Sequence, residues 1–276
     1  MRFAVYILVV QCWCSALAQP TPSAPELNTL MFESTFKLQQ QVDPQHAVVG
    51  TGFIMGRPMQ KKPGQARYVL VTAQHVFDGM KGDDIQVILH RRGADGKWSR
   101  VPMPLNIRNK GTPLWMRHPT ADVAVMYITL PDGVIRPGLL LPTTMLADDK
   151  TLQDLEIHPG DELNCLGFPN GLEANDYGFP ILRSGGIASY PLLPTKEVQT
   201  FLFDFEVFGG NSGGPVYLVH SNRVYQGATH IGVVQIVVGL VSQQAEMSGQ
   251  RLVIARVVHA SLIKEALELL PPPDEP

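Results

Sequence analysis

Short apolar runs, each bounded by Gly, Pro, Asn or Asp, recur along most of the chain. Runs of this length with turn residues between them are typical of β-strands in sandwiches and barrels. We therefore expect an all-β fold built from many short strands. The runs form an earlier group at 47–54, 68–72, 85–89 and 123–128, and a later group at 162–167, 186–190, 200–205, 215–219 and 232–238.

Two segments depart from this strand pattern. Residues 131–142 are rich in Pro and Gly without periodicity, so we interpret about 131–150 as a linker between a first β half at about 28–130 and a second at about 151–258. Over 259–270 apolar residues recur every three or four positions, which predicts an amphipathic helix. Pro271 ends this helix, and we expect 271–276 to be a disordered tail.

The first 18 residues have the pattern of a secretory signal peptide. A basic start at Arg2 precedes an apolar stretch that is too short to span a bilayer comfortably, and Ala16-Leu17-Ala18 provides small residues for cleavage after Ala18. An uncleaved anchor helix is the alternative interpretation. Residues 19–27 are Pro/Ser-rich and predict a flexible lead. The protein is therefore expected to be exported, to the periplasm or the medium.

Cleavage would leave a single cysteine. Cys12 and Cys14 belong to the predicted signal, so only Cys165 remains, and an internal disulfide is excluded. Cys165 lies in an apolar strand-like run, which favours a buried small hydrophobic residue over a reactive thiol.

The composition excludes two further classes of protein. With 45% hydrophobic residues and a net charge of only −3, the chain lacks the signature of intrinsic disorder. A nucleic-acid binder would carry a basic excess, whereas 22 Lys+Arg face 25 Asp+Glu here. The 25 Gly and 23 Pro residues imply frequent turns, in agreement with many short strands.

A glycine-flanked serine is the sharpest chemical signal. In Gly209-Gly210-Asn211-Ser212-Gly213-Gly214-Pro215 the glycines allow a tight turn that exposes the hydroxyl of Ser212. Such a loop can also aim successive backbone N–H groups into one concavity, as an oxyanion hole requires. An ordinary Gly-rich turn is the alternative.

Two other segments each present one polar side chain at the end of an apolar run. The run Val69-Leu70-Val71-Thr72-Ala73-Gln74 delivers His75 at a strand tip, where a general base would be placed. The turn His118-Pro119-Thr120-Ala121 delivers Asp122 directly before a buried strand. A carboxylate there either forms an Asx turn or orients a neighbouring imidazole.

Together the three segments resemble the chymotrypsin-like serine peptidases, most closely their disulfide-free bacterial branch with the HtrA-type proteases. The segment ending in His75 is similar to the Thr-Ala-x-His motif, the segment around Asp122 to the aspartate motif, and the Ser212 loop to the nucleophile motif. The chain order His, Asp, Ser is that of the family. The resemblance implies two six-stranded antiparallel β-barrels, with the active site between them.

It also implies a role for each matched residue. Ser212 is the expected nucleophile, His75 the general base and Asp122 the group that orients the imidazole. The backbone amides of Gly210 and Ser212 are the expected oxyanion hole. Asn211 occupies the position where the animal digestive branch has an aspartate that pairs with a new N-terminus. We therefore expect no activating cleavage. We expect the oxyanion hole to be ordered by the packing of the barrels and by amide hydrogen bonds from Asn211, or by substrate binding.

The resemblance also implies where the primary substrate pocket lies. In the family this pocket is lined by the stretch before the nucleophile and by a later strand. We expect a solvated or ion-paired Glu206 and a preference for apolar or small side chains before the scissile bond. The expected pocket residues are Glu206, Val207, Phe208, Gly209, Val233, Gln235 and Val237.

The resemblance thus predicts an exported serine endopeptidase that works through an acyl-enzyme. Two alternatives stay open: a catalytically inert binding protein on the same fold, and an esterase with the same triad. We expect protein or peptide substrates, no nucleic-acid partner, and no membrane span after signal removal. Only about 18 residues follow Val258, too few for a PDZ domain. The histidines show no HExxH-like pairing, so we expect no metal and no cofactor.

Overall fold

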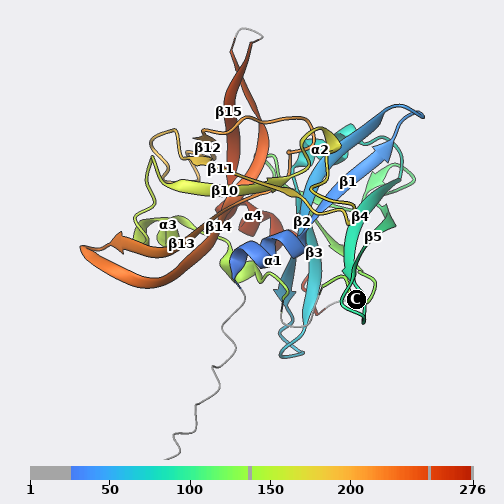
Figure 1. Cartoon of the computed structure of the whole chain (residues 1–276), viewed down its shortest axis with the longest axis horizontal. Coiled ribbons are helices and arrows are strands. Elements are labelled where there is room, and N and C mark those ends of the chain that lie inside the picture. Colours follow the sequence, from blue (N-terminus) through green and yellow to red (C-terminus); the bar gives the residue numbers. More distant parts are fainter. Residues whose placement is uncertain (1–25, 136–138, 248–249, 275–276) are drawn as a thin grey trace, which may run out of the picture.

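The computed structural model of the chain describes residues 26–135, 139–247 and 250–274. It contains two antiparallel sheets that form the two halves of the molecule in Figure 1. The first has seven strands in the order β5-β4-β1-β2-β3-β9-β8, and the second has six in the order β11-β10-β13-β14-β15-β12. The predicted all-β fold with two antiparallel halves is confirmed, and the additional strand of the first half is the two-residue β8. The predicted signal peptide lies outside the described residues.

The elements have the following bounds. The first sheet contains β1 (Thr35–Gln41), β2 (Ala47–Pro58), β3 (Ala66–Thr72), β4 (Asp84–Arg92), β5 (Trp98–Asn106), β8 (Met116–Arg117) and β9 (Ala124–Ile128). The second contains β10 (Glu162–Gly167), β11 (Ile181–Gly186), β12 (Thr200–Phe203), β13 (Pro215–Tyr225), β14 (Ala228–Met247) and β15 (Gln250–His259). A separate hairpin joins β6 (Arg108–Asn109) and β7 (Thr112–Pro113). The helices are α1 (Leu27–Ser34), α2 (Gln74–Gly79), α3 (Asp149–Asp154) and α4 (Ala260–Glu268), with 3-10 turns η1 (Thr143–Met145) and η2 (Pro169–Gly171).

Backbone hydrogen bonds close the second sheet on itself. Just after β11, Ile187 bridges Phe203 of β12 and Ala188 N–H donates to Leu202 O (2.8 Å). Just after β12, Asp204 N–H donates to Gly186 O of β11 (2.8 Å). Closure removes the free edges that an open sheet would expose. It also fixes the start of the segment that leads from β12 to Ser212.

The long strand β14 belongs to two hairpins that project from the body in Figure 1. Its first part pairs with β13 and its last part with β15. The β14–β15 register shifts between Val241 and Gln243, so that Ser242 is an extra residue in the ladder. A bulge of this kind re-aims the side chain that it carries.

The C-terminal helix belongs to the core of the first half. The predicted helix at 259–270 is confirmed as α4, and its buried side chains include Leu262, Ile263 and Leu267. These residues pack in one cluster with Phe53 and Leu70 of the first sheet. The helix therefore ties the end of the second half to the first.

The first and last segments that the structure describes are better anchored than expected. Leu27, assigned to the flexible lead, is fully buried and begins α1. The prediction of a disordered tail is wrong for 271–274, because the hydroxyl of Tyr127 donates to Pro271 O (2.7 Å) and the carboxylate of Asp274 accepts the N–H groups of Gln60 and Lys61. Proline ends the helix, but these contacts hold the chain against the first sheet.

Cys165 is buried, as predicted. Burial raises the pKa of its thiol to about 12, so the reactive thiolate is suppressed at neutral pH. Over the residues that are described, no helix is both long and apolar enough to cross a membrane.

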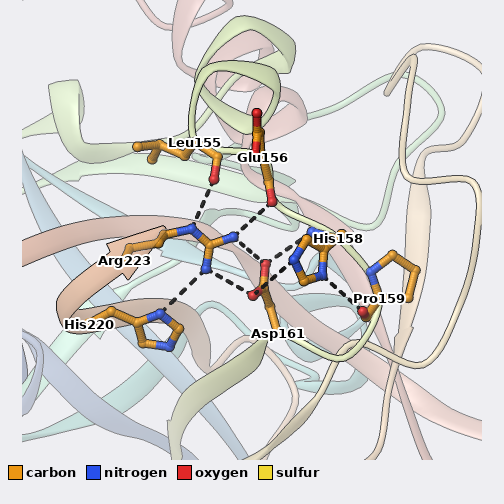
Figure 2. A network of polar contacts seen from close by, with 7 residues as sticks. All are labelled: Leu155, Glu156, His158, Pro159, Asp161, His220 and Arg223. Atoms are coloured by element: carbon orange, nitrogen blue, oxygen red, sulfur yellow. Dashed lines mark hydrogen bonds and ion pairs between the residues drawn. The ribbon is translucent and has the colours of Figure 1, made fainter. Parts of the chain in front are cut away.

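A buried ion pair anchors the β13–β14 hairpin close to its turn, where Arg223 pairs with His230. Figure 2 shows the guanidinium of Arg223 between the carboxylate of Asp161 and the carbonyl groups of Leu155 and Glu156. Two hydrogen bonds of 2.8 and 2.7 Å join Arg223 to Asp161. Burial alone would raise the pKa of Asp161, but the bonds from Arg223 and from His158 N–H outweigh it and lower the pKa below its ordinary value of 3.8.

Substitution Asp161→Asn should therefore destabilise the fold. It leaves the buried guanidinium without its counter-charge, and we expect the free energy of unfolding at pH 7 to fall by about 3 kcal/mol. The control Asp154→Asn removes an exposed pair with Lys150 and should change the free energy of unfolding far less, because solvent screens the pair. Urea denaturation measures both.

The effect of Asp161→Asn should depend on pH. Because the folded pKa is lowered, the carboxylate stabilises the fold fully above the ordinary pKa of 3.8, and this stabilisation is lost as the pH falls through the folded value. The free energies of unfolding of the native protein and of Asp161→Asn should therefore converge in acid. A difference that persists undiminished at pH 2 would contradict this account.

Candidate active site

His75 and Asp122 form a direct pair on the first sheet. Strand β3 ends at Thr72 and is followed by the short helix α2, so His75 lies in the first turn of a helix just beyond the predicted strand tip. Its Nδ1 lies 2.7 Å from Asp122 Oδ2, and its backbone N–H donates to Asp122 Oδ1 (3.0 Å). A carboxylate at Nδ1 selects the tautomer with its proton on Nδ1, which leaves Nε2 free to accept one.

The turn that presents Asp122 is organised by His118. The Nδ1 atom of His118 accepts the backbone N–H groups of Thr120 (3.2 Å) and Ala121 (3.0 Å), while its Nε2 contacts Glu265 of α4 (3.1 Å). Since Nδ1 accepts, the proton of this imidazole is on Nε2 and faces the carboxylate. Helix α4 therefore supports the aspartate turn through one buried side chain.

Ser242 connects Asp122 with Ser212. Its Oγ donates to Asp122 Oδ2 (2.5 Å), and its backbone carbonyl accepts the Ser212 hydroxyl (3.0 Å). Sequence reasoning missed Ser242, because only the β14 bulge turns it toward the site. The one signal available in the sequence was a small polar residue directly after the apolar run 231–241.

Asp122 is held in its charged form. Partial burial would raise its pKa, but the hydrogen bond and charge interaction with His75 and the bond from Ser242 outweigh burial and lower the pKa. Oδ1 accepts His75 N–H, and Oδ2 faces both His75 Nδ1 and Ser242 Oγ. Asp122 therefore carries a fixed negative charge beside the imidazole.

Thr51 of β2 joins the Ser212 loop to the first sheet. Its backbone N–H donates to Ser212 O (2.8 Å), and its Oγ1 donates to Gly210 O (2.6 Å). Gly213 fits here because a Cβ on it would lie 2.2 Å from both Thr51 O and Thr72 Oγ1. The loop of the second sheet is thus fixed against the sheet that carries His75 and Asp122.

The peptide groups around Ser212 have a defined orientation. Gly209 O accepts Asn170 N–H (2.6 Å), and Asn211 O accepts Gly214 N–H (2.9 Å). In a trans peptide the carbonyl and the following N–H point in opposite directions, so the N–H groups of Gly210 and Ser212 point away from those partners. Among the described residues, neither of these N–H groups donates to another protein group. Two free donors therefore flank the Ser212 hydroxyl.

Gly210 is required for this arrangement. Its φ is +96°, and a Cβ there would lie 2.2 Å from Phe168 O. Asn211 is buried, but its Nδ2 makes no hydrogen bond. The expectation that amide hydrogen bonds from Asn211 order the loop is therefore wrong. The bonds from Thr51 and Asn170 fix the loop instead.

The segment that carries Asn170 is itself anchored to the first sheet. Glu173 accepts Arg100 Nε (2.9 Å) and Nη2 (3.0 Å) and pairs with the buried Lys37 of β1. Farther along, the ring of Phe179 stacks on His90 at 4.0 Å between centroids. Burial lowers the pKa of His90 to about 4, so this imidazole is neutral at physiological pH. We call residues 168–180 the anchor loop.

The expected pocket residues are not brought together. Val207 is buried in the core of the second half, while Phe208 and Glu206 are half-buried next to Arg183, which donates to Glu206 O (2.7 Å). Gly209 is exposed before the Ser212 loop. The later strand lies elsewhere: Val233 is 59% exposed on the β13–β14 hairpin, Gln235 accepts Leu27 N–H, and Val237 is fully buried.

The reason is the register of β14. The bulge of this strand brings Ser242 and Gln243 next to His75 and Asp122, whereas 234–237 pair with β13 farther from Ser212. The prediction for Val233, Gln235 and Val237 placed the wrong part of the strand at the site. For metal ions, the described ranges contain no group of three His, Cys, Asp or Glu side chains able to bind one.

The chain has a low similarity to three solved protease structures. The HtrA-type protease AlgW in a serine-to-alanine form with a tripeptide is 18% identical, with a TM-score of 0.49 over 87% of this chain and 60% of that one. The protease Anisep from Arthrobacter nicotinovorans is 12% identical, with a TM-score of 0.48 over 87% of this chain and 96% of that one. AlgW with a decapeptide is 18% identical, with a TM-score of 0.46 over 87% and 64% of the two chains.

The chain thus spans less than two thirds of the length of the AlgW structures it matches. No curated protein is similar enough to count as a match. The model of the trypsin-like peptidase domain matches residues 50–225, a range that contains His75, Asp122 and Ser212. Because this range is more than half of the chain, the protein belongs to the trypsin-like peptidase domain family of serine-type peptidases.

Proposed function

We propose that the protein is an exported serine endopeptidase in which Ser212, His75 and Asp122 form the catalytic triad. The observation that carries the proposal is the Asp122–His75 pair on one sheet, facing a serine loop of the other sheet with two unpaired N–H donors. Export rests on the signal-like sequence of residues 1–18.

The geometry supports the following reaction. The Ser212 hydroxyl turns from Ser242 O toward His75 Nε2, which accepts its proton while Oγ attacks the peptide carbonyl. Asp122 stabilises the imidazolium that forms. The amides of Gly210 and Ser212 bind the developing oxyanion, and His75 then donates its proton to the leaving amine. Water then attacks the acyl-enzyme while His75 accepts its proton, and His75 returns a proton to the Ser212 oxygen as the acid product leaves.

One observation bears on the inert alternative. The Ser212 hydroxyl donates to Ser242 O, and an inert protein would keep it there. A hydroxyl rotates readily, however, because it exchanges one acceptor for another. A serine-reactive fluorophosphonate probe separates the two functions, since only an activated Ser212 becomes labelled.

Ser212→Ala and His75→Ala should each abolish nearly all peptidase activity and probe labelling. Asp122→Asn should lower kcat on the order of 10⁴-fold, because the amide selects the wrong imidazole tautomer. Ser221→Ala, an exposed serine on the β13–β14 hairpin, is the control and should leave activity unchanged. Peptide hydrolysis and thermal melting are measured together. Full activity in a folded Ser212→Ala protein would overturn the proposal.

Activity should fall as the pH is lowered. The pKa of Asp122 is lowered, so its carboxylate stays charged in mild acid. The loss should therefore come from protonation of the imidazole, which can no longer accept the serine proton. The profile of kcat/KM against pH measures this dependence. An optimum at about pH 4 would contradict a serine–histidine mechanism.

The anchor loop should support turnover more than substrate binding. Glu173→Gln weakens the contacts with Lys37 and Arg100 and so loosens Asn170, which holds the Gly209–Gly210 peptide. We expect kcat to fall about 10- to 100-fold with little change in KM, a partial loss of oxyanion stabilisation. Glu162→Gln, at an exposed position of β10, is the control. Equal kcat in both variants would show that the loop does not support the oxyanion site.

A further inference from the structure

A depression of about 540 Å³ lies beside His75, between the two sheets. The first half contributes His75 and Asp122 to its lining, and the second half contributes Gln199, Ser242, Gln243 and Arg256. Because Ser242 also contacts Ser212, a peptide bound at Ser212 passes next to this depression. Its chemistry therefore bears on which side chains near the scissile bond are accepted.

Arg256 is the cation of this depression. It lies in β15 between Gln243 of β14 and Leu202 of β12, which fixes its backbone on both sides. Of its five N–H donors, one contacts Thr200 Oγ1 (3.2 Å), while the buried Nε has no acceptor. Among the side chains that the structure describes, which do not include those of 244 and 246–251, no carboxylate forms an ion pair with it. The guanidinium therefore has more N–H donors than it has hydrogen-bond acceptors.

The other polar groups in the depression do not supply the missing acceptor. Both oxygens of Asp122 already accept hydrogen bonds from His75 and Ser242. Gln199 donates through Nε2 to Thr120 Oγ1 (2.8 Å), and Gln243 is exposed at the rim. The depression thus offers a cation and amide groups, and its only carboxylate is engaged.

We propose that this depression is a substrate subsite for a carboxylate side chain, with Arg256 as the residue that determines the preference. A planar guanidinium binds a carboxylate with two parallel hydrogen bonds, more strongly than it binds a neutral amide. The proposal rests on the proposed peptidase function, and it adds to it an acidic residue close to the scissile bond of preferred substrates.

The kinetic test uses quenched octapeptides in which one position at a time is fixed as Glu, Gln or Lys. The native enzyme should cleave the Glu peptide at least about tenfold faster in kcat/KM at one position, as expected for a hydrogen bond to a charged group. Arg256→Gln should remove this preference while cleavage of the Gln peptides is retained. Arg256→Glu should reverse it in favour of Lys. The control Lys62→Gln removes one exposed positive charge from the connection between β2 and β3, and it should behave like the native enzyme.

A binding test is independent of catalysis. In Ser212→Ala, the preferred Glu peptide should bind at least about tenfold more tightly than its Gln partner by calorimetry, and this difference should vanish in Ser212→Ala/Arg256→Gln. Equal binding of the two peptides to Ser212→Ala would overturn the subsite, whatever the enzyme's activity. If the fluorophosphonate probe does not label the native protein, the proposed peptidase function is overturned instead.

Thermal melting shows whether each variant folds, and Arg256→Lys is a second variant for the case in which Arg256→Gln does not. If Arg256→Gln does not fold, Arg256→Lys keeps the charge but loses the two-pronged geometry, so a weaker preference for Glu at the same position supports the subsite. A preference of native strength in Arg256→Gln, or the same preference at every position, would show that Arg256 does not determine selectivity.

Discussion

The contact between Thr51 and the Ser212 loop is the constraint on which the rest of the site depends. The imidazole–carboxylate pair belongs to one sheet and the serine to the other, so the distance between them is set by the way the sheets meet. Two hydrogen bonds from Thr51, one backbone and one side-chain, fix that meeting at the loop itself. Glycine at 213 permits the close approach, because any side chain would collide with Thr51 and Thr72. The packing of the two sheets therefore also sets the geometry of the proposed site.

Charged residues are few in this chain, and several of those that are buried hold loops. Arg223 and Asp161 hold one hairpin near its turn, while Lys37, Arg100 and Glu173 hold the anchor loop. His118 uses both ring nitrogens to join the aspartate turn to α4. Each contact connects segments that are far apart in sequence. Loops without regular secondary structure thereby gain defined positions around a site that needs precise placement.

The sequence was informative wherever the pattern is local. Apolar runs between turn residues predicted the sheets, three- and four-residue spacing predicted α4, and the glycines around Ser212 indicated a loop with exposed amides. The anchoring of Asp274, the burial of Leu27 and the role of Ser242 depend on contacts between distant segments, which no local pattern reports. The pocket prediction failed at Val233, Gln235 and Val237 for the same reason, since a bulge decides which part of the long strand lies next to His75 and Asp122.

The packing of α4 has a consequence for the order in which the molecule can fold. Leu262, Ile263 and Leu267 complete the core of the first half, although about 130 residues separate them from β9, the last strand of that half. During synthesis the first sheet therefore emerges with part of its apolar surface uncovered, and stays so until the second half has followed it. The first half cannot mature as an independent folding unit. The two halves must reach their final packing together, in a step that the last helix completes.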